Sequence, residues 1–389
     1  MNCHSVTSIL FVIDSLRLGG AERSLCTLLN LLPAEKFDIE VALTARGGEL
    51  ERLIPGHVRL ATLTTVRKGL FGRLLHHFSR LRLLLTRLLT PGRHPNESFW
   101  CSFSSSIPPM SKKYDIAVAY QQGFSTYYVA TKVNAIRKIA WINADISSVG
   151  YSEKFNLPYY RLFSKIVTVS DRLRDIVNTI YPSLTHNLLV INDILDPKLL
   201  LRLSESGNPF AEASRATLRI LTVGRLFKVK GIDMAVDAAA ILRERGLDFH
   251  WTIIGDGPMR TELMKSIRNR SLESSVTLEG AKANPYPYFR HCDIYVQPSR
   301  SEGYGIAVCE AKIFDCPVIA TDFPVAHDRI DNGSDGLICP MSPQGIADAV
   351  ISLSDPKTRG NIRMKLTSVH DLTSQTELPK LLSLLTNEN

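Results

Sequence analysis

Short runs of apolar residues alternate with amphipathic stretches along most of the chain. In the first half, the runs predict strands at 9–13, 39–43, 116–120, 138–142, 166–169 and 188–191, and a helix over 21–32. In the second half, they predict strands at 218–223, 250–254, 276–278, 294–296, 317–320 and 337–339, and a helix over 232–245. Continuous runs of this kind are typical of strands that a parallel sheet buries on both faces. The pattern therefore predicts an α/β protein.

The chain has 389 residues, more than one ordinary hydrophobic core supports. A polar run within 203–215 reads Ser-Glu-Ser-Gly-Asn-Pro and predicts a linker. Because strands and helices alternate on both sides of this break, we expect two doubly wound, Rossmann-like domains facing a cleft. The first, acceptor-side domain covers 1–205 and the second covers 216–370. A final helix over 371–389 is expected to pack back on the first domain.

The overall composition is that of a soluble globular protein, with 44% hydrophobic and 22% charged residues. No apolar run approaches the roughly 18–20 residues that span a bilayer, and the N-terminus lacks the basic first segment of a signal peptide. We therefore expect a cytoplasmic protein. The seven cysteines are scattered and include no C-x-x-C pair, which indicates buried thiols rather than disulfides or a zinc site.

The net charge of +8 is concentrated in one segment, because residues 52–96 contain nine Lys or Arg and no Asp or Glu. Within 67–93 the pattern predicts an amphipathic helix, with Arg73, Arg80 and Arg87 on one face and Arg82 intruding on the other. The apolar face consists of Phe71, Leu74, Leu75, Phe78, Leu85 and Leu89.

This amphipathic helix has three interpretations. The one that we favour is contact with an anionic membrane surface. The second is a domain helix with its leucines in the core and its arginines in water. The third is nucleic-acid binding, which we do not expect because no aromatic residues are interleaved with the charges. The following stretch, 90–112, is rich in proline and serine and is expected to be a mobile loop near the acceptor side.

A basic loop follows the predicted strand at 218–223 and reads Gly224-Arg225-Leu226-Phe227-Lys228-Val229-Lys230-Gly231. Gly224 allows the backbone to approach a ligand closely. Arg225 offers a planar fork for phosphate oxygens, and Lys230 offers a mobile point charge. Gly231 then opens a helix whose N-terminus favours anions. The loop suits a diphosphate; the alternative is an ordinary basic surface loop.

A pair of glutamates follows the predicted strand at 294–296, in the run Glu302-Gly303-Tyr304-Gly305-Ile306-Ala307-Val308-Cys309-Glu310. The glycines predict a tight turn into a helix that starts near Ile306, with Glu310 on its first turns. Carboxylates accept hydrogen bonds from vicinal diols, and N–H groups at a helix start bind anions or hydroxyls. A ribose or a hexose is therefore a natural partner. The alternative is a pair of solvated acids at a helix start, where the dipole favours them.

A third motif, Leu18-Gly19-Gly20-Ala21-Glu22, follows the first strand and opens a helix. Gly19 and Gly20 leave room for a substrate to approach, although many turns between a strand and a helix carry glycine. The motif is not G-x-G-x-x-G, so the nicotinamide-binding pattern is absent. The sequence also has no D-x-D-like carboxylate cluster, and we expect neither a metal nor a cofactor.

Taken in this order, the three motifs resemble those of retaining glycosyltransferases with the GT-B fold, in the large group 4 family of bacterial sugar transferases (glycosyl transferases group 1). The resemblance covers most of the chain and is strongest over 218–340. It implies that Arg225 and Lys230 bind the diphosphate of a nucleotide sugar, and that Glu302 contacts the transferred hexose. It also implies a set of residues around the ribose and the phosphates: Gly19, Gly20, Gly224, Gly305, Ile306 and Glu310.

Two departures from the family pattern concern the sugar and the acceptor. Relatives often carry a histidine where this chain has Asn143, and asparagine can hydrogen-bond a sugar hydroxyl but cannot act as an acid or base. Relatives usually have a glutamate after a Gly-Gly turn where this chain has Asp328, which has a shorter reach. The neighbouring His327 is expected to be incidental.

The resemblance implies a metal-independent retaining glycosyltransferase that moves a hexose from a nucleotide-sugar donor, expected to be a UDP-sugar, to a glycan or lipid-linked acceptor. The expected setting is cell-surface polysaccharide biosynthesis on the inner face of the cell membrane. Two other functions stay open. One is a nucleotide-sugar epimerase of similar shape, and the other is a non-catalytic nucleotide-sugar-binding protein. The intact set of Arg225, Lys230, Glu302 and Glu310 favours the transferase.

Overall fold

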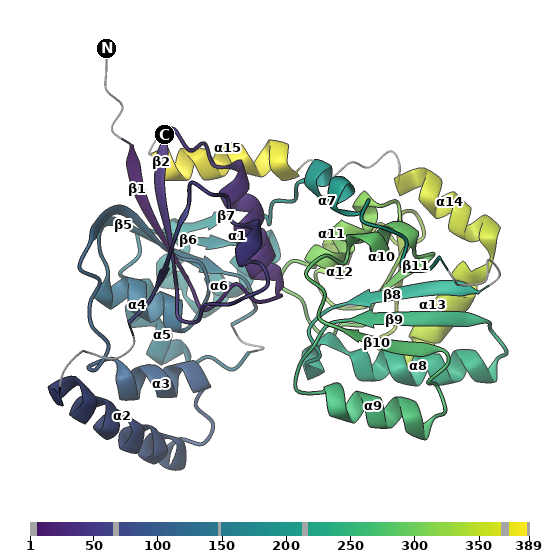
Figure 1. Ribbon diagram of the computed structural model, residues 1–389, viewed down its shortest axis with the longest axis horizontal. Helices are drawn as coiled ribbons and strands as arrows, with labels where there is room; N and C mark the ends of the chain where they lie inside the picture. The colour runs from purple at the N-terminus through teal and green to yellow at the C-terminus, as the bar shows by residue number, and fades with distance from the viewer. Residues whose placement is uncertain (1–5, 65–69, 147–148, 212–216, 367–372, 387–389) are drawn as a thin grey trace. The chain divides into compact units, whose positions relative to one another are not determined.

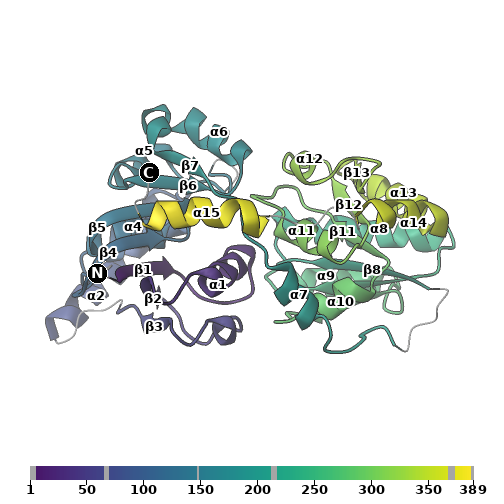
Figure 2. The same cartoon turned by 90° about the horizontal axis from the view of Figure 1, so that it is seen from above.

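The computed structural model of the protein describes residues 6–64, 70–146, 149–211, 217–366 and 373–386. The chain divides into two compact units. One comprises Met1–Arg17, Ala21–Ile194 and Gln375–Asn389, and the other comprises Leu18–Gly20 and Leu195–Ser374. Each unit is built on one parallel sheet covered by helices (Figure 1, Figure 2). The predicted class, two doubly wound α/β domains, is confirmed.

The first sheet has the strand order β3-β2-β1-β4-β5-β6-β7, and its strand pairs are parallel. The chain runs outward from β1 to β3, then crosses to the other side of β1 and runs outward again. The order therefore reverses between β1 and β4, which makes their carboxyl ends a topological switch point. The strands are β1 (Thr7–Ile13), β2 (Phe37–Leu43), β3 (Arg59–Thr62), β4 (Lys113–Ala119), β5 (Asn134–Ile142), β6 (Lys165–Thr168) and β7 (Leu188–Val190).

The C-terminal helix packs on the first unit, although the whole second unit separates the two in the sequence. The Glu377 carboxylate accepts a hydrogen bond from the Asn192 backbone N–H at 3.0 Å, and Arg137 donates one to the Leu385 carbonyl at 3.1 Å. The helices of this unit are α1 (Gly20–Leu31), α2 (Leu70–Leu89), α3 (Pro95–Phe103), α4 (Phe124–Lys132), α5 (Glu153–Tyr160), α6 (Asp171–Ile180) and α15 (Thr373–Thr386), with 3-10 helices η1 (Glu51–Leu53) and η2 (Pro182–Asn187). Over the described ranges, none of the helices is both long and apolar enough to cross a membrane.

The expectation of a mobile loop over 90–112 is wrong, because this stretch contains α3. Pro95 lies in the first turn of α3, where its missing N–H leaves no helical hydrogen bond unmade. The His94 side chain caps the helix by accepting a hydrogen bond from the Asn96 N–H at 3.2 Å. Trp100 and Phe103, one helical turn apart, are buried and fix the helix on the unit.

The predicted amphipathic helix forms as α2, but its apolar residues do not lie in a core. Leu74, Phe78, Leu85 and Leu89 are each at least 50% exposed. The interpretation of α2 as a helix with its leucines in the core is therefore wrong. The side chains of Phe71 and Arg73 lie outside the described part of the chain.

The second sheet has the strand order β10-β9-β8-β11-β12-β13, again with parallel pairs. Here the chain runs outward from β8 to β10 and then crosses to β11 on the other side of β8. The switch point of this sheet therefore lies between β8 and β11. The strands are β8 (Leu218–Val223), β9 (Phe249–Ile254), β10 (Val276–Gly280), β11 (Ile294–Gln297), β12 (Val318–Thr321) and β13 (Gly336–Cys339).

The division between the units falls at Leu195, before the predicted linker at 203–215. The reason is that Leu195, Leu200 and Phe210 join the buried apolar cluster of the second unit, so that α7 belongs to it. The helices here are α7 (Pro197–Leu203), α8 (Ile232–Glu244), α9 (Arg260–Asn269), α10 (Tyr286–His291), α11 (Ile306–Ile313), α12 (Ala326–Arg329), α13 (Pro343–Ser354) and α14 (Pro356–Leu366), with the 3-10 helix η3 (Lys228–Lys230).

Candidate active site

The basic loop and the first glutamate lie at the switch point of the second sheet. The basic loop follows β8, and Glu302 lies in the loop that follows β11, the parallel neighbour of β8. In doubly wound sheets, ligands bind at the carboxyl ends of the strands on either side of this reversal. The fold thus brings together two motifs that are more than 70 residues apart, as the separation of 72 between Lys230 and Glu302 shows.

The Glu302 carboxylate is held by three side chains. Lys230 Nζ lies 2.7 Å from both of its oxygens. One of these oxygens, Glu302 Oε1, also accepts hydrogen bonds from Gln297 Nε2 at 2.9 Å and from Ser299 Oγ at 2.6 Å. The Glu302 side chain is only 9% exposed, so these contacts fix its position. Two predicted site residues, Lys230 and Glu302, form one ion pair.

A second ion pair fastens the basic loop to the glutamate loop. Arg300 binds both oxygens of Asp233 at 2.8 Å, and Lys228 Nζ binds the same carboxylate at 2.7 Å. Burial works against the ionised form, but hydrogen bonds and charge from Arg300 and Lys228 lower the pKa of Asp233 to about 2. The Arg300 N–H also donates to the Val229 carbonyl at 2.7 Å. The two loops are therefore held as one platform.

The glycines of the basic loop have different physical roles. Gly231 has φ +65°, and a Cβ there would lie 1.8 Å from the Pro298 carbonyl oxygen, so the fold itself requires glycine. At Gly224, the nearest atoms to a Cβ are on the Lys230 side chain, 4.0 Å away. No packing contact requires glycine at 224, and the space beside the Lys230 side chain is open.

Arg225 is exposed, and its guanidinium lies 5.1 Å from the centroid of the Phe227 ring. Within the described ranges it forms no ion pair, in contrast to Lys228 and Lys230. An exposed guanidinium without an anionic partner among the described residues is available to a ligand phosphate.

Glu310 lies on α11 and is buried, with 1% of the residue exposed. Its Oε1 accepts a hydrogen bond from the Tyr286 hydroxyl at 2.9 Å. Burial raises the pKa of the Tyr295 phenol, and the charges of Glu302 and Glu310 raise it further. The charges of both glutamates thus act on the same phenol.

The turn before α11 is shaped for a helix start. Gly305 has φ +82° and precedes Ile306, the first residue of the helix. Arg329 donates from Nε to the Tyr304 carbonyl at 3.1 Å and stacks its guanidinium 3.8 Å from the centroid of the Tyr304 ring. Arg329 therefore fixes the turn that orients the first N–H groups of α11.

Asp328 is exposed on α12, and in the described ranges it forms no ion pair with Lys230, which pairs with Glu302. The neighbouring His327 pairs with Asp322 at 2.7 Å, with both side chains 60% exposed. Gly19 belongs with the second unit, and a Cβ on Gly20 would meet nothing within 4 Å. Packing therefore does not require glycine at position 20.

The first unit holds a polar cluster at its own switch point, which the motifs did not reveal. Asp14 directly follows β1; its N–H donates to Gln121 Oε1 at 3.3 Å, and Ser125 Oγ donates to its carboxylate at 3.4 Å. Gln121 in turn donates to Glu22 at 3.0 Å. Burial, and then the charge of Glu22, raise the pKa of Asp14 to about 6. The available signal was its position at the end of the first strand.

Asn143 follows β5 on the same edge of the first sheet. Its Nδ2 donates to the Tyr120 carbonyl at 2.7 Å, and its N–H donates to Gln122 Oε1 at 3.0 Å. Its Oδ1 is buried and has no hydrogen-bond partner among the residues that the structure describes. The protein therefore uses one of the two N–H groups of this amide.

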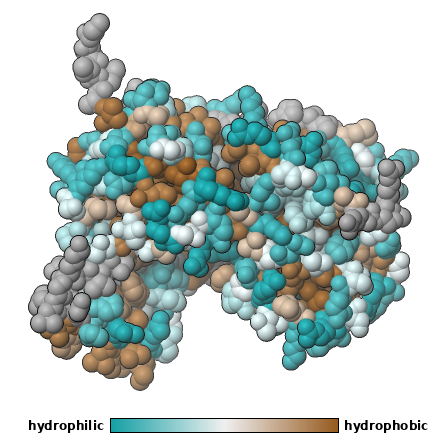
Figure 3. All heavy atoms as spheres, in the orientation of Figure 1, coloured by the Kyte–Doolittle hydropathy of each residue, from teal (hydrophilic) through white to brown (hydrophobic). Residues whose placement is uncertain are grey.

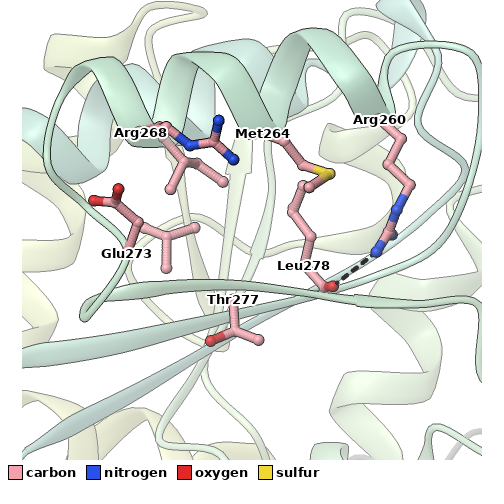
Figure 4. Close-up of a pocket in the computed structure, with 8 residues that line it drawn as sticks. Arg260, Met264, Arg268, Glu273, Thr277 and Leu278 are labelled. Carbon is pink, nitrogen blue, oxygen red and sulfur yellow. Dashed lines mark hydrogen bonds between the residues drawn. The ribbon is translucent and has the colours of Figure 1, made fainter.

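A hollow of about 250 Å³ lies between α9 and β10 of the second unit. Arg260, Met264, Arg268 and Glu273 line it, and Arg260 donates to the Leu278 carbonyl at 3.3 Å (Figure 4). It contains none of the predicted site residues. In the part of the chain that the structure describes, no three His, Cys, Asp or Glu side chains are grouped to hold a metal ion.

Two doubly wound α/β units, each built on one parallel sheet, match the GT-B class of fold. Solved structures agree. The crystal structure of Anabaena HepE in complex with UDP and glucose superimposes with a TM-score of 0.73 over 98% of this chain and 100% of HepE, at 18% identity. At that identity the likeness concerns the fold.

Residues 211–366 match the family model of Glycosyl transferases group 1. The resemblance drawn from the motifs is confirmed. Alpha-D-kanosaminyltransferase of Streptomyces kanamyceticus is 35% identical over 163 residues, which are 38% of this chain and 42% of that protein. The amylovoran biosynthesis glycosyltransferase AmsK of Erwinia amylovora is 31% identical over 150 residues, 36% of each chain. The match thus spans less than half the length of these relatives.

Proposed function

We propose that the protein is a retaining glycosyltransferase that moves a hexose from a nucleotide diphosphate sugar to a glycan or lipid-linked acceptor. The observation that carries the proposal is the partly buried Lys230–Glu302 ion pair at the switch point of the second sheet, with Arg225, which forms no ion pair with the described residues, in the same loop. Cations that bind a diphosphate stand there beside a carboxylate that binds hydroxyls. The named activities of the curated relatives support the same reaction class.

The donor is expected to bind along the platform formed by the two loops. Its diphosphate contacts Arg225 and Lys230, using the open space at Gly224. Lys230 then shares its charge with phosphate, and Glu302 accepts a hydrogen bond from a hexose hydroxyl. Glu310 takes the ribose hydroxyls. The N–H groups at Gly305 and Ile306, and the turn at Gly19 and Gly20, complete the set of donor contacts.

The chemistry needs stabilisation of a leaving group. When the sugar–oxygen bond breaks, negative charge develops on the departing diphosphate, and Arg225 and Lys230 stabilise it. The acceptor hydroxyl attacks from the same face, and its proton passes to the departing phosphate oxygen, so that configuration is retained. Because two side chains supply positive charge, we expect turnover to persist in EDTA. UDP is the expected nucleotide, supported by the UDP complexes of HepE.

The acceptor is expected to use the polar edge of the first sheet. Asn143 at this edge and Asp328 in the second unit are the candidate residues on the acceptor and sugar side. The name of AmsK, which concerns amylovoran biosynthesis, supports a cell-surface polysaccharide setting.

The test is acceptor-dependent release of nucleotide. The purified protein is incubated with labelled UDP- and GDP-hexoses, with and without bacterial lipid extract or glycan, and free nucleotide and labelled product are measured. Release of UDP only with acceptor supports the proposal. Conversion of one hexose to another without release would identify an epimerase. Tight nucleotide binding without turnover of any donor would identify a binding protein.

A further inference from the structure

The helix α2 forms an outer layer of the first unit and packs on α3. The ring of His76 lies 5.3 Å from that of Phe103. Ser79, one turn further along α2, is 6% exposed. α3 itself contacts the body of the unit, since Trp100 lies 5.7 Å from the rings of Phe124 and Tyr127. One face of α2 is thus occupied by packing, and the other faces away from the unit (Figure 1).

The outward face of α2 is an apolar ridge. Seven of its residues are between 50% and 82% exposed, namely Leu74, Phe78, Leu81, Leu84, Leu85, Leu88 and Leu89. The exposed large apolar side chains of the rest of the chain are scattered over many elements. Figure 3 shows the gathering of hydrophobic side chains over α2. A contiguous exposed ridge of this kind marks an interaction surface.

Arginines flank the ridge on both sides. At about 100° per residue, Arg80 and Arg87 fall on one side of it and Arg82 on the other. All three are exposed, and α2 contains no Asp or Glu. A helix with an outward apolar ridge between two basic flanks matches an anionic bilayer, where the ridge enters the acyl boundary and the arginines meet headgroups.

We propose that α2 is an in-plane anchor that binds the protein to an anionic lipid bilayer through its apolar ridge and flanking arginines. A second copy of the chain is a poorer occupant, because two such faces would bring arginines together. An anionic bilayer offers negative headgroups to the arginines and an apolar acyl region to the ridge. This inference does not depend on the donor site, which lies in the second unit.

The experiment is sedimentation of the full chain with vesicles of phosphatidylcholine alone and of phosphatidylcholine mixed with phosphatidylglycerol. We expect binding to the mixed vesicles and little to phosphatidylcholine. Phe78→Gln/Leu81→Gln/Leu88→Gln should lower the partition coefficient by at least about tenfold. The matched control is Ile136→Gln/Leu162→Gln/Leu201→Gln, at positions that are 70%, 53% and 44% exposed.

The arginines are tested separately. Arg80→Gln/Arg87→Gln should weaken binding to the mixed vesicles by about tenfold and reduce its salt dependence. The control variant Arg172→Gln/Arg268→Gln changes exposed arginines on other helices. It should leave vesicle binding and its salt dependence unchanged. Equal binding to neutral and anionic vesicles, or no difference between these two variants, would overturn the role of charge.

Insertion has its own readout. In the Phe78→Trp variant, brominated lipid should quench the fluorescence of the introduced tryptophan. The native Trp100, Trp141 and Trp251 are at most 3% exposed, so their fluorescence should be quenched little. In the control variant Ile136→Trp, the fluorescence of the introduced tryptophan should not be quenched. No vesicle binding by the wild type would overturn the proposal, and so would a dimer in light scattering that the apolar triple variant dissociates. The latter result would assign the ridge to a second copy.

Discussion

The second sheet presents cations and a buried glutamate at its switch point, whereas the first presents amides and an aspartate. The loops after β8 and β11 carry Arg225, Lys230 and Glu302. The loops after β1 and β4 carry Asp14 and Gln121. Since the two sheets share the same kind of reversal, the topology decides where a ligand binds and the side chains decide which ligand. Our proposal of a diphosphate site in the second unit and an acceptor site in the first rests on this difference.

The largest expected effect is that of removing the exposed cation of the basic loop, Arg225. Arg225→Ala should lower kcat/KM by about 10²–10³-fold, because the departing diphosphate loses a preorganised charge. The melting temperature should not change, since Arg225 is exposed. Arg268→Ala, another exposed arginine of the second unit, is the control. Full activity in Arg225→Ala would remove the diphosphate from the basic loop.

A smaller loss is expected for the buried carboxylate. Glu302→Gln should lower kcat by about 30-fold, because a charge-assisted hydrogen bond to the sugar becomes a neutral one. The Kd for UDP, measured by calorimetry, should change little. Equal losses in kcat and UDP affinity would place Glu302 on the nucleotide instead of the hexose.

The aspartate of the first unit should reveal itself through pH. Its pKa is raised from 3.8 to about 6, so the folded protein keeps this proton longer than the unfolded chain. This group therefore lowers the free energy of unfolding as pH rises from about 4 to about 6, with no further loss above. Relative to wild type, Asp14→Asn should gain up to about 3 kcal/mol of stability over that range.

Urea unfolding at a series of pH values measures this gain, with Asp171→Asn at an exposed position as the control. If the difference in free energy of unfolding between Asp14→Asn and wild type is constant from pH 4 to pH 7, the pKa of the Asp14 carboxyl is not raised. The contrast between the two switch points would then be one of charge alone.

The smallest expected effect concerns glycine. Gly224→Ala should weaken UDP binding by about tenfold, because the added methyl fills the space intended for the diphosphate beside the Lys230 side chain. Stability should hold within about 0.5 kcal/mol, as for an ordinary surface substitution. Gly92→Ala, where a Cβ meets nothing within 4 Å, is the control. Unchanged UDP affinity in Gly224→Ala would place the diphosphate elsewhere.

Local patterns predicted the elements that carry the second site. Leu218–Val223 was expected as a strand and is β8, and the helix expected from Ile232 is α8. Both predictions are confirmed, because the pattern of a buried strand and that of the helix after it each lie in consecutive residues. The β3 strand was missed, since its four residues are half-exposed and carry no clear alternation.

Contacts across the sequence could not be predicted in this way. Asp233 and Arg300 are 67 residues apart, and nothing in either motif indicates that they join the two loops. The support of Glu302 by Gln297 and Ser299 depends on the path of the chain after β11. The raised pKa of Asp14 depends on burial, which a single sequence does not report.

The most direct test of the central claim is thermal stabilisation of the protein by UDP, GDP, ADP and CDP, in wild type, Arg225→Ala and Arg268→Ala. The account predicts that UDP raises the melting temperature of wild type and of Arg268→Ala, and that the shift vanishes in Arg225→Ala. No shift with any nucleotide, or an equal shift in all three proteins, would contradict a nucleotide diphosphate site at the β8–β11 switch point.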